Sequence, residues 1–166
     1  MKKKVILALA LCLLAVMMWK AKERTAELAI PQAIISEKKA AQQETLVDWG
    51  ITMTVINATP TGCTLEITQS GGTATGEIHC GEDYYVQALA EDGWHNLEYI
   101  ITDNYAIPSI AYIVSEDYPR NFNLNWQQVY GVLPSGTYRI AKELMDSRAP
   151  GDFDEAYHFS QSFVIE

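Results

Sequence analysis

From Leu46 onward, the chain is dominated by short segments in which apolar and polar residues alternate. Apolar side chains occupy every second position from Ile51 to Val55, and again from Cys63 to Ile67 after a turn at residues 59–62. Successive side chains of a strand point to opposite faces, so this period of two predicts half-buried β-strands. Turn signals about every eight to twelve residues then favour an all-β sandwich or barrel with few helices.

The same pattern predicts about seven strands in residues 46–166, close to the size of an immunoglobulin-like antiparallel β-sandwich. A hairpin turn is expected at residues 91–93, and a longer connection at residues 104–118. The expected strands cover residues 51–55, 63–68, 83–89, 94–101, 120–126, 136–143 and 156–165.

Aromatic residues follow the same alternation and separate into two expected groups. In residues 120–126, Phe122, Leu124 and Trp126 share one face, and three asparagines share the other. Aromatics on the inward face fill the core, whereas exposed ones can stack on sugars or anchor a protein contact. The expected inward residues are Tyr84, Trp94, Trp126 and Tyr138, and the expected exposed residues are Tyr85, Tyr105, Tyr118 and Tyr130.

The N-terminal 45 residues differ in character from the rest. Three lysines precede an uncharged apolar run at residues 5–19, the layout of a signal peptide or signal anchor over residues 1–20 with a hydrophobic helix. A span of about 22 Å favours a cleaved signal, whereas Lys20, Lys22 and the missing small-residue cleavage pair favour an uncleaved anchor. Residues 21–45 are predicted to be a stem. Both alternatives place the domain at residues 46–166 outside the cytoplasm, membrane-anchored or secreted.

Charge is distributed unevenly along the chain, whose net charge is -9. Six of its twelve basic residues lie in the first 24 positions, and from Leu46 onward four cations face seventeen carboxylates, a balance of 4 - 17 = -13. A surface of that sign repels phosphate backbones, so nucleic acid is not an expected partner. The membrane is an expected partner, through the N-terminal segment.

Residues 133–140 contain the most specific local signal for a sandwich. Pro134 and Gly136 form a turn just before Tyr138 at the start of a predicted strand. This spacing predicts a tyrosine corner, in which the hydroxyl turns back to bond the backbone a few residues upstream. The alternative is an ordinary turn followed by a half-buried aromatic.

Several short motifs together carry a family resemblance. They are residues 57–62, residues 69–72 with Thr75-Gly76, Gly93-Trp94, Asn125-Trp126 with Tyr130-Gly131, residues 133–140 with Lys142, and Asp146 with Gly151-Asp152. Over residues 49–166 the chain resembles the bacterial immunoglobulin-like domains of clostridial and related envelope proteins. The resemblance implies a non-catalytic β-sandwich, usually secreted or anchored, with no general enzymatic activity or cofactor. Cys63 and Cys80 depart from the family pattern.

Cys63 and Cys80 lie in a domain expected to be outside the cytoplasm, where a disulfide can persist. A bridge between them would close a loop of about 18 residues and stabilise the fold by roughly 3 kcal/mol. The alternative is two separate buried thiols. Spacing alone leaves both open, because the bond needs Cα atoms within about 4.4 to 6.8 Å.

Four carboxylates crowd the segment before the last predicted strand: Asp146, Asp152, Asp154 and Glu155. They form a candidate calcium or ligand loop, and the alternative is a solvated acidic loop neutralised by Arg148. The chain contains no nucleophile elbow, phosphate loop, dinucleotide fingerprint or zinc-protease motif, and its three histidines are isolated. We therefore predict no catalytic, cofactor-binding or metal-ligating residues.

These observations predict a non-catalytic immunoglobulin-like module for protein binding or envelope structure. Edge strands of such a sandwich can accept an added strand from a partner, so recognition of a protein or peptide is the first mechanism expected. The alternative function is an extracytoplasmic sensor for cell-wall glycan or calcium that uses the acidic loop and exposed aromatics. A third hypothesis is a hydrolase whose catalytic residues are far apart in the sequence, and it would require a deep cleft.

Overall fold

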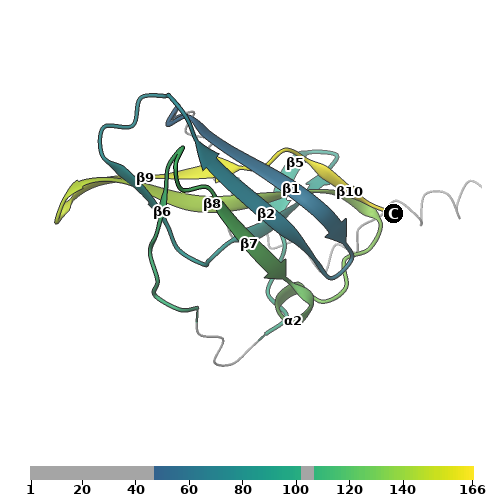
Figure 1. Ribbon diagram of the computed structural model, residues 1–166. Helices are drawn as coiled ribbons and strands as arrows, with labels where there is room; N and C mark the ends of the chain where they lie inside the picture. The colour runs from purple at the N-terminus through teal and green to yellow at the C-terminus, as the bar shows by residue number, and fades with distance from the viewer. Residues whose placement is uncertain (1–46, 102–106) are drawn as a thin grey trace, which may run out of the picture. The chain divides into compact units, whose positions relative to one another are not determined.

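The computed structural model of the protein describes residues 47–101 and 107–166. The predicted leader at residues 1–20, the stem at residues 21–45 and Tyr105 lie outside the described residues. Within the described residues, no helix is long and apolar enough to cross a membrane. The described chain forms two antiparallel sheets and a single helical turn, so the prediction of an all-β sandwich is confirmed (Figure 1).

The smaller sheet has three strands in the order β1 (Ile51–Thr59), β2 (Gly62–Gln69) and β7 (Arg120–Asn125). The β1–β2 turn is held by Thr59, whose hydroxyl donates to the Gly62 carbonyl at 2.9 Å and accepts from the Gly62 N–H at 3.1 Å. The register pairs Leu65 with Phe122, which keeps the apolar set of both strands on one face.

The larger sheet is built around β8 (Gly136–Ala149), a strand of 14 residues. One edge of β8 pairs first with β4 (Tyr85–Ala90) and then with β3 (Glu77–Cys80), and the opposite edge pairs with β10 (Phe163–Ile165) and then β9 (Asp152–Phe159). β5 (Gly93–Asn96) extends the sheet beyond β4, and β6 (Tyr112–Val114) extends it beyond β3. One strand therefore organises the whole sheet.

The core lies between the two sheets. Leu65 and Ile67 of the smaller sheet and Val86 and Ile140 of the larger sheet are fully buried. Burying each such side chain contributes about 1.5 to 3 kcal/mol. Trp126 is the N-cap residue of the short helix α2 (Gln127–Tyr130) and is also fully buried, with its indole N–H donating to the Pro60 carbonyl at 3.0 Å.

The predicted strand limits were wrong in several places. The sequence pattern missed β3 and β6, because strands of four and three residues are too short to show alternation clearly. The expected strand 94–101 ends at Asn96, and the expected strand 136–143 continues to Ala149. The described residues thus hold ten strands where about seven were expected.

The expected last strand, residues 156–165, is divided into β9 and β10 by Ser160. The backbone N–H of Ser160 still donates to the Ile140 carbonyl at 2.9 Å, but its side-chain oxygen accepts from the Ile140 N–H at 3.0 Å. The hydroxyl therefore takes the place of a ladder carbonyl, and the chain is free to leave β8 before returning as β10.

Three of the aromatic predictions are confirmed and one is wrong. Trp126 and Tyr138 are fully buried as expected, and Tyr118 is 62% exposed. Tyr84, Tyr85 and Trp94 are half-buried. Tyr130, expected to be exposed, is only 4% exposed. The helical turn α2 carries it beneath β4, where its hydroxyl accepts from the Val86 N–H at 3.3 Å.

Candidate edge-strand groove

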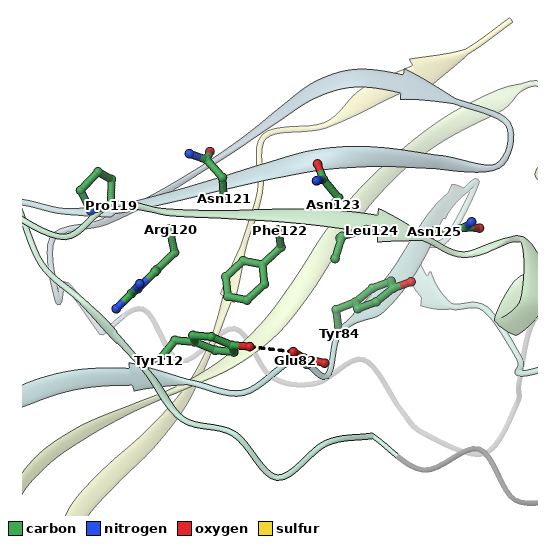
Figure 2. A pocket seen from close by; sticks show the side chains of 10 residues that line it. All are labelled: Glu82, Tyr84, Tyr112, Pro119, Arg120, Asn121, Phe122, Asn123, Leu124 and Asn125. Atoms are coloured by element: carbon green, nitrogen blue, oxygen red, sulfur yellow. Dashed lines mark hydrogen bonds between the residues drawn. The ribbon is translucent and has the colours of Figure 1, made fainter.

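A groove of about 520 Å³ runs along the open side of β7. Its other wall comes from the larger sheet: the β3–β4 loop contributes Glu82 and Tyr84, and β6 contributes Tyr112 (Figure 2). From β7, the side chains of Arg120, Phe122 and Leu124 point into the groove, whereas Asn121 and Asn123 point away from it. We call this site the β7 groove. The predicted alternation in residues 120–126 placed these side chains correctly.

The backbone of β7 offers unused hydrogen-bonding groups toward the groove. Trp126 donates to the Thr61 carbonyl at 3.0 Å, one step beyond the Gly62–Asn125 pair that ends the β2–β7 register. In an antiparallel ladder hydrogen-bonded pairs alternate, so the backbones of Arg120, Phe122 and Leu124 bond to β2. The N–H and C=O groups of residues 121, 123 and 125 then point to the open edge. In the described residues, no strand pairs with that edge.

The remaining sheet edges are short, charged or, in the case of β1, covered in part. The Gln161 N–H donates to the Met53 carbonyl of β1 at 3.3 Å, which covers part of the β1 edge. β5 and β6 have only four and three residues, and β9 begins with Asp152, Asp154 and Glu155. Short length and charge are the usual means by which proteins block strand edges. β7, with six residues, carries Arg120 as its only charge.

Aromatic and polar contacts hold the wall opposite β7. The Tyr112 hydroxyl donates to Glu82 Oε1 at 2.7 Å, and the Tyr112 ring meets the Phe122 ring edge-on with centroids 5.4 Å apart. The hydrogen bond to Glu82 raises the pKa of Tyr112. Arg120 is fixed by a bond from Nε to the Ile113 carbonyl at 2.7 Å, with its guanidinium 5.8 Å from the Tyr112 ring centroid. The groove is therefore largely preformed.

A buried lysine supports the β7 groove from the core. Lys142 of β8 is 1% exposed, and its Nζ donates to the carbonyls of Gly81 and Asp83, each at 2.7 Å. These two residues flank Glu82 in the β3–β4 loop. Burial lowers the pKa of Lys142, because the ammonium is removed from water. A buried cation held by two carbonyls rather than by a carboxylate fixes the loop that carries Glu82.

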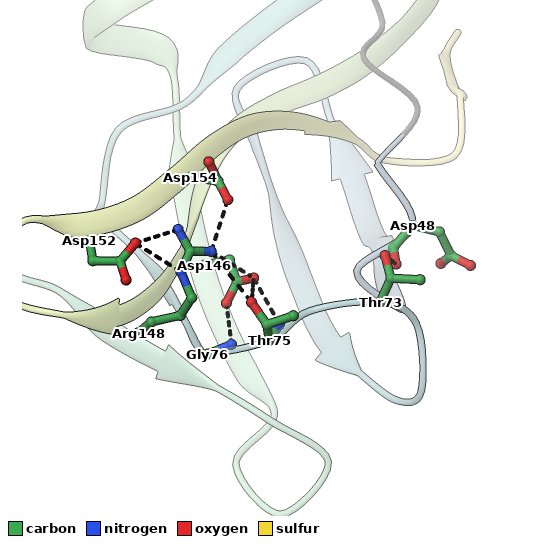
Figure 3. A network of polar contacts seen from close by, with 8 residues as sticks. All are labelled: Asp48, Thr73, Thr75, Gly76, Asp146, Arg148, Asp152 and Asp154. Carbon is green, nitrogen blue, oxygen red and sulfur yellow. Dashed lines mark hydrogen bonds and ion pairs between the residues drawn. The ribbon is translucent and has the colours of Figure 1, made fainter.

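The four predicted ligand carboxylates do not form a loop. Asp146 lies within β8, and Asp152, Asp154 and Glu155 lie in β9, so the segment is a hairpin of two paired strands. Figure 3 shows that Arg148 lies among three of them, with its guanidinium 2.8 Å from Asp152, 2.8 Å from Asp154 and 3.7 Å from Asp146. Glu155 is exposed and opposite Met145 in the ladder.

Asp146 is 2% exposed and has its own donors. It accepts hydrogen bonds from the Gly76 N–H at 2.6 Å, the Thr75 N–H at 2.9 Å and the Thr75 hydroxyl at 3.2 Å (Figure 3). Burial acts to raise the pKa of Asp146, but these hydrogen bonds outweigh it and lower the pKa. Asp146 therefore ties the segment before β3 to β8. Among the described residues, no three carboxylates, histidines or cysteines are grouped so that they could hold a metal ion.

Cys63 and Cys80 lie in different sheets and are both free, buried thiols. Of the two alternatives left open by the sequence, the structure has separate thiols. Burial raises the pKa of Cys63 to about 12, and burial is also the main cause that raises the pKa of Cys80. Both thiols are protonated at neutral pH, which makes them poor nucleophiles.

Tyr138 has the geometry of a tyrosine corner. Its side chain is fully buried, and its hydroxyl donates to the Pro134 carbonyl four residues upstream at 2.8 Å. A Cβ at Gly136 would lie 3.2 Å from the Tyr138 ring, which accounts for glycine in this turn. The corner fixes the start of β8.

The comparison with known families agrees with these findings. A family model described as the bacterial Ig-like domain matches residues 47–163, which is well over half of the chain. No curated protein and no solved structure matches the chain. The matched residues coincide with the two-sheet sandwich and include the tyrosine corner. The chain belongs to the bacterial Ig-like domain family.

Proposed function

We propose that this domain is a non-catalytic binding module that takes up an extended segment of a partner protein as an additional strand beside β7. The family is generally non-catalytic, which agrees with a binding or structural role. Strand addition gives affinity through main-chain hydrogen bonds and specificity through pockets for alternate side chains. The β7 groove offers both features along one edge.

The proposal rests on two features that lie together, the unpaired edge of β7 and the groove beside it. The backbone of residues 121, 123 and 125 supplies donors and acceptors, and the groove of about 520 Å³ supplies space for side chains of the incoming strand. An unprotected strand edge invites aggregation, and the other edges of this domain are short, charged or, for β1, covered in part. The open edge of β7 is therefore best explained as a binding site for a partner strand.

We place this module outside the cytoplasm, attached to the membrane or secreted. The apolar run at residues 5–19 behind three lysines supports this location. Domains of this family are often extracellular or surface-associated. The charge balance of -13 from Leu46 onward repels phosphate backbones, which favours a protein partner over a nucleic acid.

The test uses a proline substitution that blocks the open edge without breaking the sheet. Asn123→Pro removes an N–H that points toward the groove and away from β2, a place where an edge strand tolerates proline. Asn123→Thr, which keeps the N–H, is the matched control. The full chain in detergent is used to select peptides from a displayed random library, and their affinity is then measured for both variants. We expect Asn123→Pro to lower the peptide affinity at least about tenfold, near 1.4 kcal/mol, and Asn123→Thr to leave it unchanged. Equal affinity for both variants would refute the proposal.

A further inference from the structure

The β7 groove presents one cation and one anion at different positions along β7. Arg120 uses Nε for the Ile113 carbonyl, which leaves its terminal N–H groups for another acceptor. Among the described residues, neither Arg120 nor Glu82 takes part in an ion pair. From the part of the chain that the structure describes, Glu82 accepts one hydrogen bond, donated by Tyr112 to Oε1, so Oε2 can accept another. Each charge therefore has capacity for a partner.

The two charges are separated along the strand in a definite order. Figure 2 shows Arg120 beside Tyr112 at the start of β7, and Glu82 across from the later residues Phe122 and Leu124. Arg120, Phe122 and Leu124 point into the groove at alternate positions, and the groove-facing side chains of an added strand must follow the same period of two. The side chain nearest Glu82, the side chain beside Phe122 and the side chain nearest Arg120 would then follow one another at intervals of two residues along the partner.

The middle of the groove is apolar. The Phe122 ring meets the Tyr112 ring edge-on, and the buried Lys142 Nζ lies 4.8 Å from the Phe122 centroid. An apolar side chain of the partner fits between the two charged positions because it covers these rings without burying a new charge. A carboxylate matches the planar donors of Arg120, and an ammonium or guanidinium matches Glu82.

We infer that the β7 groove, in the role given to it under the proposed function, selects segments with a basic residue, an apolar residue two positions later and an acidic residue two positions after that. The segment runs antiparallel to β7, so its basic end lies by Glu82 and its acidic end lies by Arg120. The balance of -13 in residues 46–166 further favours the basic end on approach.

The experiment compares three capped seven-residue peptides of threonine with valine at the centre. The first has lysine at the second position and glutamate at the sixth, the second has these two exchanged, and the third has threonine at both. Affinity for the full chain in detergent is measured by calorimetry at low and at physiological salt. We expect the first peptide to bind about tenfold more tightly than the other two, with the difference reduced by salt.

Variants of the two charged residues then assign the selectivity. Glu82→Gln keeps an oxygen for Tyr112 and removes only the charge, so the preference for lysine should disappear. Arg120→Gln should remove the preference for glutamate, and the double variant Glu82→Lys with Arg120→Glu should favour the exchanged peptide. Thermal unfolding of each variant shows whether it is folded. If the double variant does not fold, Glu82→Gln alone tests the preference for lysine.

The outcomes separate this inference from the proposed function. Equal binding of the three peptides, with sensitivity to Asn123→Pro, would overturn the charge order and leave the strand-addition proposal in place. Tighter binding of the exchanged peptide would overturn the antiparallel direction. A dimer of the full chain that dissociates on Asn123→Pro would identify a second copy as the occupant and also overturn the inference. Binding that ignores Asn123→Pro would contradict both.

Discussion

The Nζ atom of Lys142 lies 4.8 Å from the centroid of the Phe122 ring, so a buried cation of the larger sheet contacts the groove-facing side of β7. The same atom donates to the two carbonyls that flank Glu82. One side chain thus connects both walls of the β7 groove. Burying an ammonium without a carboxylate costs stability, which makes Lys142 an unusual choice for a core position.

Replacing Lys142 by methionine tests separately what Lys142 contributes to the stability of the fold and what it contributes to the shape of the groove. We expect Lys142→Met to leave the free energy of unfolding unchanged or to raise it by about 1 to 2 kcal/mol, because apolar replacements of buried charges are often neutral or stabilising. The carbonyls of the half-exposed Gly81 and Asp83 can turn to water instead. Urea unfolding measures this effect.

Peptide affinity of the same variant should fall several-fold, because the loop that carries Glu82 loses its support. The affinity is measured with the lysine–valine–glutamate peptide described above. A large loss of stability with unchanged affinity would show that Lys142 serves the core alone.

Removing the Tyr138 hydroxyl tests the tyrosine corner. Tyr138→Phe deletes the bond to the Pro134 carbonyl and keeps the ring, so we expect a loss of about 1 kcal/mol in the free energy of unfolding. Tyr118→Phe, at a 62% exposed position, is the matched control and should change stability by less than about 0.5 kcal/mol. Urea unfolding compares the two, and equal losses would argue against the corner.

Asp146 should make the domain sensitive to acid. Its pKa is lowered in the folded state, so its contribution to stability is present above the usual pKa of 3.8 and is lost as the pH falls through the folded-state value. Asp146→Asn should cost about 2 to 4 kcal/mol at neutral pH, because buried donors lose a charged acceptor. Asp154→Asn, at an exposed carboxylate of the Arg148 cluster, should cost little.

Urea unfolding at neutral pH and near pH 3 gives this comparison. A dependence on pH below 3.8 that Asp146→Asn leaves intact would assign the acid sensitivity to other carboxylates.

His158 should lower stability at mildly acidic pH. Its Nε2 is buried and has no hydrogen-bond partner within residues 47–101 and 107–166, the Trp49 ring centroid lies 5.2 Å from its ring and Lys142 is its neighbour in the ladder. Burial lowers the pKa of His158 below its usual 6.5, so the unfolded chain binds the proton more readily. The contribution of His158 is therefore constant above pH 6.5 and becomes unfavourable as the pH falls below it.

His158→Phe should remove this part of the pH dependence. The measurement is the melting temperature of both proteins between pH 7.5 and pH 5, under conditions where unfolding is reversible. Parallel curves for the two proteins would mean that His158 does not titrate differently on folding.

Much of the fold follows from alternation, and the failures have local causes. The hairpins at 51–69 and 85–96 were predictable because their apolar residues fall on one face and their turns carry Pro60 and Gly93. The second half of β8 was hidden, because Asp146 and Arg148 look like loop residues until Thr75 and Gly76 supply the donors that allow the carboxylate to be buried.

The groove itself was only partly predictable. The alternation of Arg120, Phe122 and Leu124 was visible in the sequence, and edge-strand recognition was the expected mechanism. That β7 forms an edge, and that Glu82 lies opposite it, depends on pairing between residues far apart in the chain. Tyr130 illustrates the same limit, since one helical turn reverses its expected exposure.

The most direct test of strand addition is amide hydrogen exchange along β7, followed by NMR on the full chain with and without the lysine–valine–glutamate peptide. We expect the peptide to slow exchange at the amides of Asn121, Asn123 and Asn125, which point to the open edge. The amides of Phe122 and Leu124 should already be protected by β2 and change little. If the peptide binds and the three asparagine amides exchange as fast as before, it does not add as a strand beside β7.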